Sequence, residues 1–181
     1  MSNQNLSEFD IQETIKNVAN LMGVAARTAP KSVGEDFVVV KAIYGEDVKK
    51  LAKQMLTYGE ELGKRNFDRD GINVKNSPAL LLIGIKDAAS LGLNCGACGF
   101  DKCSERISHK GVEFDGPQCA FRLLDMGIAI GSAVKTAGIM NVDNRIMYRA
   151  GVVARKMGLI DADFVMGIPL SVSGKSIFFD R

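Results

Sequence analysis

The chain opens, after a short polar stretch, with apolar residues that recur at the period of an α-helix. They stand three or four positions apart, at Ile11, Ile15, Val18, Ala19 and Met22. Such spacing places them on one side of a helix. The pattern continues to about Thr28, and Pro30 stops it because proline cannot extend a helix. The sequence therefore predicts a helix over residues 10–28.

Three short runs rich in β-branched or other apolar residues predict strands. They are "DFVVVKAIYG" at 36–45, "PALLLIGIKDA" at 78–88 and "ADFVMGIPLSV" at 162–172. The middle run is continuously apolar, which is typical of a strand that is buried on both faces.

Longer amphipathic or apolar stretches predict three more helices, over 46–65, 121–140 and 144–159. The polar stretch 65–77 is expected to be a loop, and 173–181 an extended tail. The resulting order is helix, strand, helix, strand, cysteine segment, helix, helix, strand. That order predicts an α/β or α+β layered fold, with residues 1–181 forming a single domain.

Composition narrows the classes of partner. The chain has 181 residues, is 46% hydrophobic and 24% charged, carries a net charge of +2 and has no tryptophan. This balance predicts no nucleic-acid partner, because it offers neither strong positive charge nor an aromatic stacking platform. The polar start has no leader pattern, and the longest apolar run is too short to span a membrane. We therefore expect a cytoplasmic protein without a membrane partner.

Cysteine placement is the strongest chemical signal. Cys95, Cys98, Cys103 and Cys119 follow the spacing C-x2-C-x4-C-x15-C, with Gly96 and Gly99 beside them. Residues 91–121, hereafter the cysteine segment, have little apolar periodicity and are expected to be an insertion between core elements. Structural disulfides are rare in the reducing cytoplasm, so clustered cysteines there indicate metal or redox chemistry. The glycines can reach backbone angles that bring N–H groups close to sulfur.

Three interpretations of the cysteine segment remain open from spacing alone. The first is an iron–sulfur cluster, whose negative charge the basic residues of the segment would offset; these are Lys102, Arg106, His109 and Lys110. The second is a structural zinc site, although the last two cysteines do not form the usual C-x2-C pair. The third is four reduced cysteines packed as small apolar residues, which the polar, glycine-rich setting disfavours. His109, the only histidine, lies in a polar stretch and is expected at the surface.

The stretch "NCGACGFDKC", followed by the distant Cys119, resembles a known ligand motif. It is similar to the [4Fe–4S] motif of the large subunit of the corrinoid iron–sulfur protein and of electron-transport complex subunits. This resemblance covers about thirty residues and implies ligation by Cys95, Cys98, Cys103 and Cys119. Soft thiolate donors suit that assignment.

The rest of the chain resembles nitroreductase-like flavoproteins. The similar stretches are "NVANLMGVAARTAPKSVGEDFVVV", "SPALLLIGI", "DMGIAIGSAVKTAGIM" and "GLIDADFVMGIPLSVSGK". This likeness implies a mixed sheet flanked by helices, FMN bound at the interface of a homodimer, and basic residues around the flavin phosphate. The matching residues are Arg27, Lys31, Ser32 and Lys175. Cations and N–H donors are what a phosphate requires.

This chain departs from the flavoprotein pattern in two places. The arginine-rich stretch before the first helix is missing, and the loop after Pro30 reads "KSVGEDF" in place of the usual asparagine and glutamine. Cysteine motif and fold together resemble a group of small proteins described as containing a ferredoxin domain. This resemblance implies a cluster and a fold but not a reaction. Our first hypothesis is a [4Fe–4S] electron-transfer protein, and if the protein is an enzyme we expect an FMN-dependent oxidoreductase of nitroreductase type. A four-cysteine zinc scaffold or interaction module is the alternative, and nothing identifies the redox partner.

Overall fold

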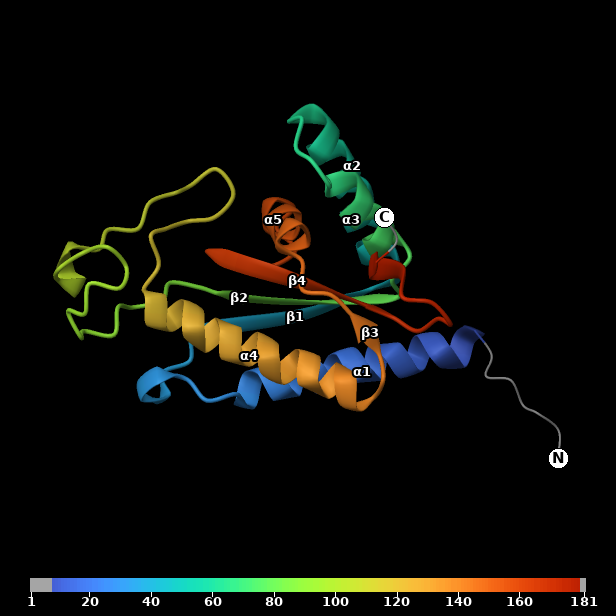
Figure 1. The fold of residues 1–181 in the computed structure, drawn as a ribbon, viewed down its shortest axis with the longest axis horizontal. Helices are drawn as coiled ribbons and strands as arrows, with labels where there is room; N and C mark the ends of the chain where they lie inside the picture. Colours follow the sequence, from blue (N-terminus) through green and yellow to red (C-terminus); the bar gives the residue numbers. More distant parts are fainter. Residues whose placement is uncertain (1–7, 180–181) are drawn as a thin grey trace.

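The computed structural model describes residues 8–179. A four-stranded sheet lies between two layers of helices (Figure 1). The strands are β1 (Val38–Tyr44), β2 (Ala79–Ile85), β3 (Asp143–Asn144) and β4 (Phe164–Ser171). One helical layer contains α1 (Glu8–Thr28) and α4 (Ala120–Ile139), and the other contains α2 (Gly45–Glu61), α3 (Phe67–Lys75) and α5 (Tyr148–Lys156). The layered α/β fold predicted from the sequence is confirmed.

The sheet has the strand order β1-β2-β4-β3, and all three pairings are antiparallel. The expectation of a mixed sheet is therefore wrong. Tyr44, the last residue of β1, pairs with Ala79, the first residue of β2. The reason lies in the connection: α2 and α3 pack as a helical hairpin that returns the chain to the end where β1 stopped (Figure 1). The next strand must then run in the opposite direction.

Two cores lie on opposite faces of the sheet, because successive side chains of a strand point to opposite sides. Strand β2 is buried along its whole length. Leu81 and Ile83 face α1 and α4, whereas Leu80 and Leu82 face the layer of α2 and α5. The predicted doubly buried strand is confirmed. Burial of such side chains contributes roughly 1.5–3 kcal/mol each.

Helix α5 lies unusually close to β4. A Cβ atom added at Gly151 would meet the carbonyl oxygen of Val165 at 2.0 Å. Only a residue without a side chain allows this approach. The contact fixes the height of α5 above the sheet.

Helix α3 corrects the expectation of a loop over residues 65–77. Its buried face includes Asp70 and Asn73 alongside Phe67 and Val74. Arg149 Nη1 of α5 donates to Asp70 Oδ2 over 2.8 Å. Part of the contact between α3 and α5 is therefore an ion pair rather than apolar packing. Hydrophobic periodicity cannot reveal such a face, because its buried positions are partly polar.

Two further differences lie near the C-terminus. Residues 143–144 form the short strand β3, and α5 begins at Tyr148 rather than in the stretch that starts at 144. In the expected tail, Ile177–Phe179 form a single 3-10 turn, and residues 180–181 lie outside the described range. The expected absence of a leader over the first seven residues also lies outside it. Among residues 8–179, no helix is long and apolar enough to cross a membrane.

Candidate functional site

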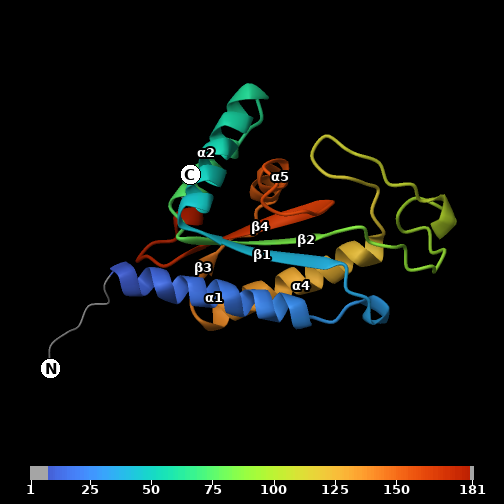
Figure 2. The same cartoon turned by 180° about the vertical axis from the view of Figure 1, so that it is seen from behind.

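The cysteine segment connects the end of β2 to the start of α4 and protrudes from one end of the sheet (Figures 1 and 2). Before α4 begins at Ala120, its only helical element among the described residues is the 3-10 turn Cys103–Glu105. Because it contributes no strand to the sheet, the segment is held in place largely by hydrogen bonds that involve side chains. Whether residues 91–121 are an insertion remains a prediction.

Cys119 lies at the N-cap of α4 and is 5% exposed. Burial alone would raise the pKa of its thiol. The backbone amides of Leu91, Arg122 and Phe121, with the charge of Arg106, outweigh burial and lower the pKa below its ordinary value of 9.0. The start of a helix offers free N–H groups that favour a negative charge. Cys119 is therefore held in a setting that favours the thiolate, the form that binds metals.

Cys103 is tied to the residue that precedes Cys95. The backbone N–H of Asn94 donates to Cys103 Sγ over 3.4 Å, and the backbone N–H of Cys103 donates to Asn94 Oδ1 over 2.8 Å. Asn94 has a φ of 50°, in the left-handed region that asparagine tolerates better than most residues. These bonds close a small loop that contains Cys95 and Cys98.

Arg106 bridges the two limbs of the segment. Its Nε donates to Ser90 Oγ over 2.7 Å, and its Nη2 donates to the carbonyl oxygen of Ala88 over 3.0 Å. Its Nη1 donates to the carbonyl oxygen of Pro117 over 2.9 Å. One guanidinium thus joins the chain entering the segment to the chain leaving it.

The four cysteines are free thiols, of which Cys95 is exposed and Cys98 and Cys103 are partly buried. Among residues 8–179, no three His, Cys, Asp or Glu side chains converge into a group ready to hold a metal ion. The donor chemistry nonetheless fits an iron–sulfur cluster: thiolates are its usual ligands, and N–H groups already face two of the sulfur atoms. The ligand set stays a prediction.

Arg122 is a buried arginine with polar partners on several elements, and the sequence did not single it out. Its side chain is 1% exposed and forms ion pairs with Asp125 and Glu35. Nε donates to the carbonyl oxygen of Ala89, and Nη1 to that of Ser32, each over 3.0 Å. It therefore links α4, the loop after α1 and the approach to the cysteine segment. An arginine within an apolar helix was the available signal, but its partners are remote in sequence.

A second group of contacts, centred on Glu113, holds the cysteine segment against the layer of α2 and α5. Tyr148 donates its hydroxyl hydrogen to Glu113 Oε2 over 2.9 Å, and Tyr58 donates to Oε1 over 3.3 Å. Lys64 forms an ion pair with the same carboxylate. Neighbouring Phe114 packs 4.3 Å, centroid to centroid, from the ring of Phe164.

The residues that resemblance assigned to the flavin phosphate fall into two places. Arg27, Lys31 and Ser32 lie together at the C-terminal end of α1. Lys31 Nζ donates to backbone carbonyls at the end of that helix, including that of Ala29 over 2.9 Å, and Ser32 donates to Asp125. Lys175 follows β4, where the chain borders the N-terminal half of α1. The structure brings together three of the four within one chain.

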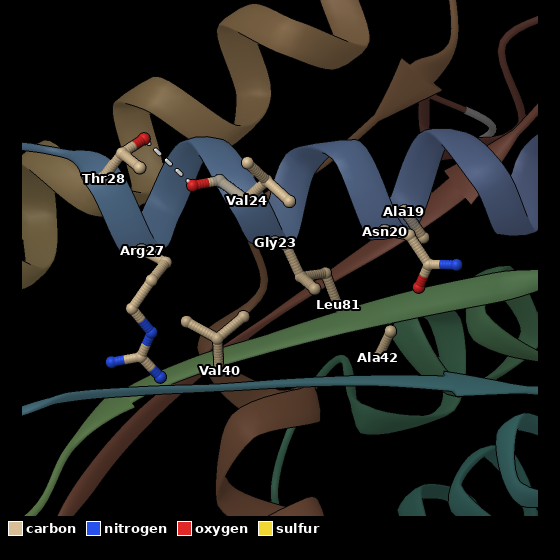
Figure 3. A pocket seen from close by; sticks show the side chains of 9 residues that line it. All are labelled: Ala19, Asn20, Gly23, Val24, Arg27, Thr28, Val40, Ala42 and Leu81. Atoms are coloured by element: carbon tan, nitrogen blue, oxygen red, sulfur yellow. Dashed lines mark hydrogen bonds between the residues drawn. The ribbon is translucent and has the colours of Figure 1, made fainter.

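Arg27 lies at one end of a cavity of about 380 Å³ between α1 and β1 (Figure 3). Asn20 lies at the other end, and small or apolar side chains line the space between them. Arg27 Nη1 donates to Asp36 Oδ2 and to the carbonyl oxygen of Val38, each over 2.7 Å. Its side chain is 52% exposed, so part of the guanidinium faces solvent beside the cavity.

Another cavity, of about 520 Å³, lies at the foot of the cysteine segment. Arg106 and His109 come from one limb and Gln118 from the other. His109 is exposed, as expected, and its backbone exchanges two hydrogen bonds with Gly116, of 2.8 and 3.0 Å.

Comparison with protein families gives one match and one close relative. Residues 115–181 match the model of the family described as "Uncharacterized protein containing a ferredoxin domain (DUF2148)", a stretch that includes Cys119 but not the other three cysteines. A protein of Archaeoglobus fulgidus, described as "Uncharacterized protein", is 50% identical over an alignment of 179 residues, and the match covers 97% of each chain.

Comparison with solved structures shows a shared fold at low identity. The nitroreductase-like family protein from Bacillus cereus is 12% identical with a TM-score of 0.57, covering 97% of this chain and 80% of that one. A nitroreductase with bound FMN from Desulfitobacterium hafniense is 12% identical with a TM-score of 0.56, covering 96% and 82%. Nitroreductase A from Vibrio parahaemolyticus is also 12% identical, with a TM-score of 0.55. This chain, covered to 97%, spans 62% of that protein's length.

Proposed function

The chain belongs to the family of proteins described as containing a ferredoxin domain, and from this premise we propose that it transfers electrons through a [4Fe–4S] cluster. The proposed ligands are Cys95, Cys98, Cys103 and Cys119. One observation carries the proposal: all four thiols lie on a single connection between β2 and α4, and backbone amides already face the sulfur atoms of Cys103 and Cys119.

A bound cluster of this kind supplies reversible exchange of single electrons. The chain's own part is to hold thiolates in place and to donate N–H groups to them. Asn94 restrains the loop of Cys95 and Cys98 against Cys103, whereas the N-terminus of α4 favours the thiolate of Cys119. Since the three exposed or partly buried cysteines lie on an irregular loop, we expect metal binding to order that loop as it closes.

The test is anaerobic purification followed by iron and sulfide analysis and electron paramagnetic resonance of the reduced protein. We expect a brown protein with about four irons per chain, consistent with four-cysteine [4Fe–4S] ligation. Cys98→Ala should lose most of the iron, and the matched control Ser104→Ala, at an exposed neighbouring position, should keep it. Full retention by Cys98→Ala contradicts the ligand set. A colourless protein with stoichiometric zinc would favour the alternative, a structural zinc scaffold.

A flavin-linked oxidoreductase is the second candidate, and the cavity beside Arg27 is the observation that favours it. Lys31 and Ser32 fit a phosphate poorly, because their donors are used within the chain. Arg27 fits better, since only its Nη1 has hydrogen-bond partners among the described residues. FMN, when bound, would supply hydride chemistry as well as single-electron steps.

Lys175 lies between Ser173 and Ile177, which line a cavity together with residues of the opposite half of α1. A site containing all four residues would therefore need contributions from two chains. A homodimer is therefore part of the flavin proposal. A yellow, fluorescent compound released on denaturation, together with a dimer in sedimentation analysis, would support it. Colourless supernatant from protein purified with excess FMN would contradict it.

We also propose a cytoplasmic location, where reducing conditions keep the cysteines free for metal.

A further inference from the structure

We propose that Arg106 is a positioning residue that closes the neck of the cysteine segment and raises the reduction potential of the cluster the segment carries. The neck is defined here as residues 88–90 on the entering limb and Pro117 on the leaving limb. This inference rests on the proposed function, because a potential can be measured only when a cluster is bound. It assigns to one side chain both the closure of the site and part of its electrostatics.

The guanidinium of Arg106 spans the neck. All three nitrogen atoms of the guanidinium donate, to Ser90 Oγ, to the carbonyl oxygen of Pro117 and to that of Ala88, over 2.7, 2.9 and 3.0 Å. The donors of arginine form a rigid planar fork, whereas a lysine ammonium is a single point charge on a flexible stem. No lysine can therefore reach all three acceptors in the same arrangement.

The neck lies close in sequence to the proposed ligands on both limbs. Pro117 lies two residues before Cys119, and Ser90 lies five residues before Cys95. The backbone amide of Leu91, next to Ser90, also faces the sulfur of Cys119. Arg106 itself lies three residues after Cys103. One side chain thus fixes the limb of Cys119 relative to the loop that bears the other three cysteines. Closing a loop of this length costs conformational entropy, and the hydrogen bonds of Arg106 help to offset that cost.

Arg106 also places a positive charge at the neck. Arg106 is half-buried, and its three hydrogen bonds hold its charge at the base of the segment. When a reductant such as dithionite donates one electron to the cluster, the cluster gains one negative charge. A fixed positive charge stabilises that reduced form more than the oxidised form. The potential is therefore higher with Arg106 than without it.

Three variants of the cluster-loaded protein separate these effects. Arg106→Gln removes the charge and most of the fork, and Arg106→Lys keeps the charge but loses the fork. The control Lys110→Gln removes a charge from an exposed position of the same segment. The measurements are the midpoint potential, from a titration followed by electron paramagnetic resonance, and the rate of iron loss to a chelator.

We expect Arg106→Gln to have a more negative potential and to lose iron several times faster than the unaltered protein. Arg106→Lys should keep most of the potential but lose iron faster. Lys110→Gln should lose iron at the unaltered rate and shift the potential less than Arg106→Gln does, because solvent screens an exposed charge. A wild-type potential and rate of iron loss in Arg106→Gln would overturn the inference. An equal shift of potential in Lys110→Gln would overturn the specific role of Arg106.

The neck can also be tested without a cluster. Hydrogen–deuterium exchange of metal-free protein should show faster exchange in Arg106→Lys than in the unaltered chain for residues 86–91 and 118–122, with α2 unchanged. Equal exchange at the neck would overturn the positioning role. If the unaltered protein binds no iron under any condition, the proposed function fails and the claim about potential fails with it, while the exchange result still decides the structural claim.

Discussion

Asn94 and Cys103 hold each other by two hydrogen bonds that run in opposite directions. The Asn94 amide donates to Cys103 Sγ over 3.4 Å, and the Cys103 amide donates to Asn94 Oδ1 over 2.8 Å. The pair restrains a cysteine and the residue before another cysteine at the same time. Because Asn94 has a φ of 50°, its identity matters for the backbone as well as for the side chain.

Substitutions at Asn94 should speed the release of iron, by an amount that depends on the new residue. Asn94→Asp keeps the acceptor and should stay close to the unaltered protein. Asn94→Gly loses the acceptor but tolerates the left-handed backbone, whereas Asn94→Ala loses the acceptor and adds about 1 kcal/mol of backbone strain. Iron release to a chelator should therefore be fastest for Asn94→Ala. Equal rates in all three would show that the pair does not restrain the site.

Replacing Arg122 should destabilise the fold strongly. Arg122→Leu leaves Asp125, 5% exposed at its side chain, without its buried cation. Breaking such a pair from one side lowers the free energy of unfolding by about 3–5 kcal/mol. Chemical denaturation measures the loss. Lys135→Leu, at an exposed position on the same helix, is the control and should change stability by about 0.5 kcal/mol or less. Similar losses in both variants would contradict the role of Arg122.

Glu113 should contribute to stability at neutral pH and lose that contribution in acid. Burial alone raises the pKa of Glu113, but hydrogen bonds from Lys64, Tyr148 and Tyr58 outweigh it, so the pKa lies below the ordinary 4.5. A lowered folded-state pKa means that the stabilisation is complete above pH 4.5 and disappears as pH falls through the folded-state pKa. Glu113→Gln should therefore be less stable than the unaltered protein at pH 7, and the difference should shrink below pH 4.5. Urea unfolding at a series of pH values tests this; a constant difference would refute it.

Two glycine-to-alanine changes should have opposite effects. Gly151→Ala places a Cβ 2.0 Å from the carbonyl oxygen of Val165, so α5 must move away from β4. We expect a loss of roughly 1–3 kcal/mol, as for other overpacked sites. Gly127→Ala on α4 meets no atom within 4 Å and should gain about 0.5–1 kcal/mol from helix propensity. Thermal unfolding of both variants is the measurement, and a stable Gly151→Ala would mean that α5 is free to shift.

Much of the element order was predictable because the pattern of apolar residues reports burial locally. Strand β2 and helix α4 differ from their predicted bounds by a few residues at most. Helix α3 was not predictable in this way, since Asp70 is buried against Arg149 of a helix about eighty residues later in the chain. A buried face whose polar members are neutralised by distant partners leaves no apolar period to detect.

Some features of the candidate site were likewise predictable from local sequence, whereas others depend on contacts between distant residues. The sequence by itself determined which thiols are available, that glycines flank them, and which helices and strands surround them, because residue chemistry and periodicity are local properties. Only the tertiary structure decided that Arg106 joins Ala88 and Ser90 to Pro117, and that Arg122 reaches the carbonyl of Ser32. It also decided that the sheet is wholly antiparallel. These contacts depend on how elements distant in sequence pack against the sheet, and no local pattern encodes the position of a remote partner.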